Sequence, residues 1–119
     1  MKNFILVCLV FISFNAYSQV SVDGVDVNKE AGVEYITMTA YLKPLTANKY
    51  GVVIDYGQKM KFAQEVRITD KEGKPVTFNG AVDALNFLDK NGWELVSVYT
   101  TFYQNVTYFN HICKRKEDF

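Results

Sequence analysis

Only one segment of the chain repeats its apolar residues at helical spacing, and it lies among several β-rich runs. Ala81, Ala84, Leu85 and Leu88 recur three and four positions apart, which predicts an amphipathic helix over about residues 79–91. A helix of roughly three turns is not stable alone in water, so its apolar stripe must pack against other elements. The sequence therefore predicts an α+β domain in which this helix covers one face of a sheet.

The expected sheet is built from runs that are rich in β-branched and aromatic residues. These runs lie at residues 33–42, 50–56, 62–69, 94–102 and 106–114, with a short edge strand at 75–78 after a turn at 70–73. The run at 33–42 has apolar residues on both faces, which favours a central position. We therefore predict a mostly antiparallel sheet of five or six strands, ending in a hairpin whose turn lies at residues 103–105.

The first 18 residues have the pattern of a cleavable secretory signal peptide. Lys2 supplies the positive charge, residues 4–14 are apolar, and residues 16–18 (Ala-Tyr-Ser) match the small-x-small pattern that precedes a cleavage site. The apolar run is shorter than the roughly 20 residues that a membrane-spanning helix needs. We therefore expect cleavage after Ser18 and an exported protein, periplasmic or extracellular, without a stable membrane anchor.

The remainder of the chain is expected to form one domain. Residues 19–32 alternate small apolar and polar residues, which fits either an N-terminal arm or a ragged strand, and residues 33–119 form a single small α+β domain. The 119-residue chain carries 13 basic and 13 acidic side chains, so it has no basic excess and nucleic acid is not an expected partner. Cys113 is the only Cys after the signal, so core packing rather than an internal disulfide must hold the fold.

The most specific string in the chain is Asn-Gly-Trp-Glu-Leu-Val-Ser-Val at residues 91–98. A helix that ends in this string, followed by a strand that ends in the basic pair Lys114-Arg115, resembles the bacterial domain-of-unknown-function family 4177. The resemblance covers about residues 78–115, and residues 43–77 look like an insertion relative to short members. It implies a helix followed by a hairpin, and it implies no activity, because the family has no established one.

The side chains that could support chemistry are few. His111 and Cys113 point to the same face of one strand, but residues two apart on a strand are about 6–7 Å apart, too far for a direct hydrogen bond. Two such residues also fall short of the three or four ligands of a zinc site. We therefore expect no catalytic residues, no cofactor and no metal. The alternative is an enzyme or small-ligand carrier with a pocket between sheet and helix, using His111 and Glu94.

Aromatic residues crowd the last hairpin of the expected sheet. One short helix covers only one face of a sheet, so some aromatic side chains are expected on the other face or at its rim, unless residues 19–32 or 43–77 cover that face. An exposed apolar patch marks an interaction surface, and tyrosine suits one because it is apolar with a polar tip. The sequence favours a non-catalytic module that binds a protein partner or a second copy of itself. The residues expected on its surface are Tyr99, Phe102, Tyr103, Tyr108 and Phe109.

Overall fold

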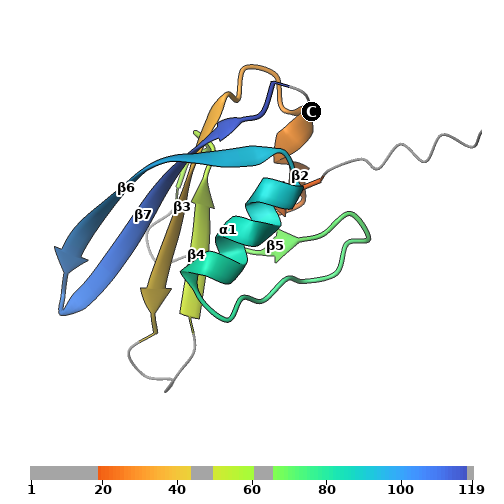
Figure 1. Cartoon of the computed structure of the whole chain (residues 1–119). Coiled ribbons are helices and arrows are strands. Elements are labelled where there is room, and N and C mark those ends of the chain that lie inside the picture. Colours follow the sequence, from red (N-terminus) through yellow and green to blue (C-terminus); the bar gives the residue numbers. More distant parts are fainter. Residues whose placement is uncertain (1–18, 44–49, 61–65, 118–119) are drawn as a thin grey trace, which may run out of the picture.

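The described residues form an α+β domain with two antiparallel sheets and one α-helix (Figure 1). The computed structural model describes residues 19–43, 50–60 and 66–117. The larger sheet has the strand order β4-β3-β7-β6, and the smaller sheet has the order β2-β1-β5. The strands are β1 (Ser21–Val22), β2 (Val25–Asp26), β3 (Tyr35–Leu42), β4 (Tyr50–Asp55), β5 (Ile68–Thr69), β6 (Trp93–Tyr103) and β7 (Val106–Arg115). A 3-10 turn, η1 (Val27–Lys29), and the helix α1 (Ala81–Lys90) complete the described elements.

The structure confirms the α+β class, the helix and the central position of β3, which lies between β4 and β7. The expectation of a single sheet with five or six strands was wrong. The run at 62–69 contributes only Ile68–Thr69 to a strand, with residues 61–65 outside the described part, and the run at 75–78 contributes one isolated bridge from Pro75 to Thr69. The backbone N–H groups of Asp70 and Val76 donate across this bridge at 3.0 and 2.9 Å, so Pro75 occupies a position where its missing N–H faces away from β5.

The core lies between the larger sheet and a layer formed by α1 and the small sheet. Ile36 and Met38 of β3 are buried with Ile54 of β4, and they pack with Ala84 and Leu88 of the helix. The apolar stripe predicted from the sequence therefore faces the sheet, as its spacing requires. This face of the sheet is called the helix face below, and the opposite one the open face.

Residues 19–32 are an ordered part of the core rather than a flexible arm. Val20, Val22 and Val27 have no exposed surface, and they belong to the same core cluster as Ile36 and Trp93. Because Ile36 lies on the helix face, this segment completes the layer that covers the helix face. Among the described residues, it does not cover the open face.

The 91–98 string turns the chain from α1 into β6. Gly92 has a φ of +93°, a left-handed conformation that costs little only for glycine, and it follows the C-cap residue Asn91. The helix begins after Gly80, two residues later than predicted, and Asp83 in its first turn accepts a hydrogen bond from the Asn79 backbone N–H at 2.9 Å. Trp93 is only 1% exposed, so its ring is part of the core.

Candidate interaction surface

The outer edge of β6 is the most open part of the larger sheet. After Trp93, every residue of this 11-residue strand is exposed. Within the part of the chain that the structure describes, β7 is the only strand paired with β6, so its other edge is free. In Figure 1, the tip of the β6–β7 hairpin projects away from α1. An edge strand of this length presents a row of unpaired backbone groups to other chains.

The register shows which backbone groups of β6 point outward. The backbone N–H of Arg115 donates to the carbonyl of Glu34 at 2.9 Å, so odd-numbered residues of β7 direct their backbone groups to β3 and even-numbered residues direct theirs to β6. The even-numbered residues of β7 lie opposite odd-numbered residues of β6 between Ser97 and Tyr103. The backbone N–H and C=O groups of Val98, Thr100 and Phe102 are therefore the ones at the free edge.

A β-bulge sets which side chains of β6 lie on each face. The register shifts between Leu95 and Ser97, so Val96 is the extra residue and the alternation of faces changes there. Leu95 pairs with the buried Cys113, and Val98 pairs with the buried His111, so both of these exposed side chains lie on the helix face. Beyond the bulge, residues 97–103 form a regular ladder with β7.

The five aromatic residues predicted for a surface are divided between the two faces. Tyr99, Tyr103 and Tyr108 lie on the open face, whereas Phe102 and Phe109 lie on the helix face. Four of them are well exposed: Phe102 at 71%, Tyr103 at 54%, Tyr99 at 47% and Phe109 at 43%. Tyr108 is half-buried because its ring packs against Tyr41, with ring centres 5.3 Å apart. The sequence reasoning found the hairpin, but it missed Leu95, Val96 and Val98, which are equally exposed on β6.

The open face has a polar row that fixes the position of its central side chain. Thr39 donates to the side-chain oxygen of Asn110 at 2.7 Å, and the Asn110 side-chain amide donates to the hydroxyl of Thr101 at 3.1 Å. These bonds join β3, β7 and β6 across the sheet. Asn110 is buried with both ends of its amide bonded, so it supports the sheet rather than offering unpaired groups to a ligand.

The structure does not bring together the residues of the alternative function. His111 is 5% exposed, and its Nδ1 lies 3.1 Å from the carbonyl oxygen of Met38. Cys113 is buried as well. Its thiol donates to the backbone carbonyl oxygen of His111 at 3.9 Å and makes no hydrogen bond to the His111 ring. Burial raises the pKa of the Cys113 thiol to about 11, which keeps it protonated near neutral pH. Glu94 is exposed and lies on the open face, on the opposite side of the sheet from His111.

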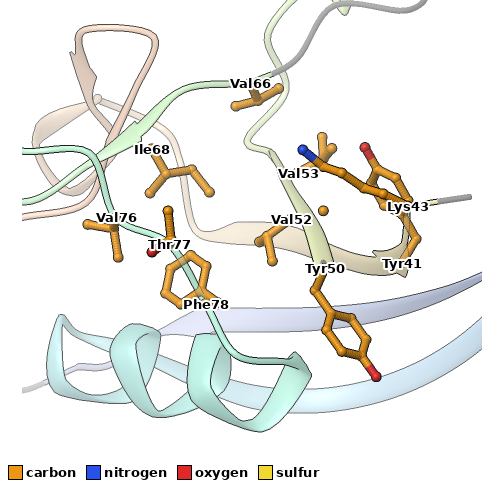
Figure 2. Close-up of a pocket in the computed structure, with 11 residues that line it drawn as sticks. Tyr41, Lys43, Tyr50, Val52, Val53, Val66, Ile68, Val76, Thr77 and Phe78 are labelled. Atoms are coloured by element: carbon orange, nitrogen blue, oxygen red, sulfur yellow. The ribbon is translucent and has the colours of Figure 1, made fainter. Parts of the chain in front are cut away.

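A small hollow of about 140 Å³ lies beside β4, at the other edge of the larger sheet. In Figure 2, Val52 points from β4 toward Ile68, Val76 and Phe78, while Tyr41 lies on the other side of the strand. His111 and Glu94 do not line this hollow. Its lining includes Tyr41, Lys43 and Tyr50 but no carboxylate and no histidine, and its volume is below the range of pockets that hold drug-sized ligands.

The described residues offer neither a metal site nor a membrane-spanning helix. Among them, no three side chains of His, Cys, Asp or Glu lie close enough together to hold a metal ion. No helix in residues 19–43, 50–60 or 66–117 has the length and apolar character needed to cross a membrane.

No protein-family model, curated protein or solved structure matches this chain.

Proposed function

We propose that this chain is an exported, non-catalytic module that associates with further copies of itself through the free edge of β6. The observation that carries the proposal is the exposure of the whole strand after Trp93, with backbone groups at its edge that no described strand pairs. Strand addition at such an edge supplies main-chain hydrogen bonds, and the flanking side chains bury apolar surface.

The composition of β6 supports association because the usual protections of an edge strand are missing. Exposed edges are normally short, or carry lysine or proline, or twist away at a bulge. β6 has 11 residues, Trp93–Tyr103, and the only charged one is Glu94 at its start. Its one bulge lies at Val96, which leaves residues 97–103 regular. A long regular edge without these protections is the kind that pairs with another strand.

The side chains beside this edge add apolar area on both faces of the sheet. Leu95, Val98 and Phe102 lie on the helix face, and Tyr99 and Tyr103 lie on the open face. All of these side chains are about half exposed or more. Exposed apolar groups that gather in one patch mark an interaction surface, whereas scattered ones do not.

Export is supported by the signal-like pattern of residues 1–18 and by where the packed domain begins. Val20 is the first fully buried residue in the described part of the chain, and the backbone N–H of Gln19 donates to the side chain of Asn91 at 3.2 Å. Cleavage after Ser18 would therefore leave the packed residues together. N-terminal sequencing of the secreted or periplasmic protein tests this part of the proposal, and a chain that begins at Met1 would contradict it.

The test of association is the molar mass of the chain from Gln19 onward, measured by light scattering during gel filtration over a range of concentrations. We expect oligomers whose fraction rises with concentration. Val98→Lys places a charge at the β6 edge and should shift the protein to the monomer, because pairing would bury that charge.

The matched control is Val82→Lys, which makes the same change on α1. Val82 is 69% exposed and points away from the sheet, so this variant should associate like the unchanged protein. Thermal unfolding of both variants checks that the domain stays folded. A monomer at every concentration for the unchanged protein, or undiminished association of Val98→Lys, would remove β6 from consideration.

A further inference from the structure

The geometry points to β6 of a second copy as the strand that pairs with β6, antiparallel and in a register that places Thr100 on a two-fold axis. This inference rests on the proposed function and names the partner strand. It joins the two larger sheets into one sheet through β6 of each copy, with both copies of α1 on the same side.

The other edge of the larger sheet is a poorer partner. At β4, the side-chain amide of Gln58 donates to the carbonyl of Ile54 at 2.8 Å, so this outward-pointing group is already bonded. The same side chain accepts from the backbone N–H of Tyr56 at 2.7 Å. Residues Val66, Ile68 and Val76 flank the remaining part of β4 across the small hollow (Figure 2). A strand from another copy has less open edge to pair with at β4 than at β6.

The register follows from the length of the regular ladder in β6. Residues 97–103 pair without interruption with β7, and the bulge at Val96 ends this stretch on one side while the turn at Gln104 ends it on the other. Thr100 is the centre of residues 97–103. An antiparallel pair centred on Thr100 sets the whole regular stretch against its own copy, and any other centre moves part of it onto the bulge or the turn.

The backbone N–H and C=O groups of β6 point in directions that allow a two-fold axis at Thr100. The N–H and C=O of Thr100 point to the free edge, so two copies of this residue can exchange both hydrogen bonds across a two-fold axis. Val98 then lies opposite Phe102 of the second copy, and the backbone N–H and C=O groups of both residues point to the shared edge. The hydrogen-bonded positions of the two edges therefore coincide in this register.

In this register the side chains of one copy also form favourable cross-strand pairs with those of the second copy. On the helix face, Val98 meets Phe102 of the second copy and the two copies of Thr100 meet each other; pairs of aromatic with β-branched residues and of threonine with threonine are favourable across strands. On the open face, Tyr99 meets Thr101 of the second copy. Glu94 lies outside residues 97–103, so no like charges face each other. A two-fold contact of this kind uses the same patch on both copies and closes as a dimer.

The test compares two double variants that both carry lysine at position 98 and differ only in the charge at position 102. In this register, Val98→Lys with Phe102→Lys sets lysine against lysine twice across the interface, whereas Val98→Lys with Phe102→Glu sets lysine against glutamate twice. Within one chain the two positions are about 13 Å apart along the strand, so the exchange has little effect inside the monomer. Both variants lose the same two apolar side chains, and each is the control for the other.

We expect the dimer dissociation constant of the lysine–lysine variant to be about tenfold or more above that of the lysine–glutamate variant at low ionic strength, and the difference to shrink in high salt. The dissociation constants come from sedimentation velocity on the chain from Gln19 onward. A lysine–glutamate variant that associates no more tightly than Val98→Lys alone or than the lysine–lysine variant, while the unchanged protein associates, would overturn the register and leave the proposed function standing. A monomeric unchanged protein would overturn both. Unfolding curves of the two variants confirm that both remain folded.

Discussion

The guanidinium of Arg115 lies over the ring of Trp93, with its central carbon 5.0 Å from the ring centre. The two residues are opposite each other at the start of β6 and the end of β7. From this position Arg115 donates to backbone carbonyls of the segment that precedes β3, including Val33 at 2.9 Å, Val27 at 3.2 Å, and Asn28. One side chain therefore fastens the N-terminal segment to the hairpin.

Arg115→Lys is expected to lower the free energy of unfolding by about 2–3 kcal/mol, because lysine cannot provide the fork of donors that reaches several carbonyls at once. Chemical denaturation measures the change. The matched control is Lys114→Ala at the neighbouring position on the open face, where a change within about 0.5 kcal/mol is expected. Equal effects of the two substitutions would show that these carbonyl contacts contribute little to stability.

Gly51 leaves room for the ring of Tyr41 on the neighbouring strand. A Cβ atom at position 51 would come within 2.3 Å of the Tyr41 ring, and this ring also packs against Tyr108. Gly51→Ala should therefore lower the free energy of unfolding by about 1–3 kcal/mol. In a Tyr41→Ala background the same change should raise it by about 0.5 kcal/mol, because alanine loses less backbone entropy than glycine on folding. Denaturation of the four proteins gives the coupling, and a loss of the same size in both backgrounds would contradict this account.

The thiol of Cys113 should make stability depend on pH in the alkaline range. Burial raises its pKa from 9.0 to about 11 in the folded protein, so between these values the unfolded chain loses a proton that the folded protein keeps. The contribution of this group to stability is present below pH 9 and is lost as the pH rises from 9 to 11. The difference in unfolding free energy between the unchanged protein and Cys113→Ala should therefore shrink over that range. A difference independent of pH would mean that the thiol titrates alike in both states.

Local sequence was sufficient for the parts of the fold that depend on near neighbours. The spacing of Ala84 and Leu88 predicted the helix and the face that it buries, and Gly92, in the string that follows the helix, takes the left-handed conformation common after helix ends. The run around Ile36 and Met38 predicted a central strand. These features follow from the period of a helix or a strand and from the backbone freedom of glycine, which act over a few residues.

The candidate surface was predicted only in part. The crowding of aromatic residues indicated the hairpin, but Tyr99 and Phe102 lie on opposite faces. The assignment of faces depends on the bulge at Val96, and nothing in the run Leu-Val-Ser-Val at residues 95–98 shows where the extra residue lies. The exposure of Val98 was not predicted either, because an apolar residue in a strand is buried or exposed according to what packs on it.

The sequence by itself determined the class of the domain, the position of the helix α1, and the specific string at residues 91–98 that leads from this helix into a strand. Only the tertiary structure decided that β6 lies at an edge, that Val98, Thr100 and Phe102 turn their backbone groups outward, and that residues 19–32 join the core instead of covering the open face. The reason is that secondary structure follows from contacts over a few residues, whereas strand order and register follow from pairing between segments far apart in the chain.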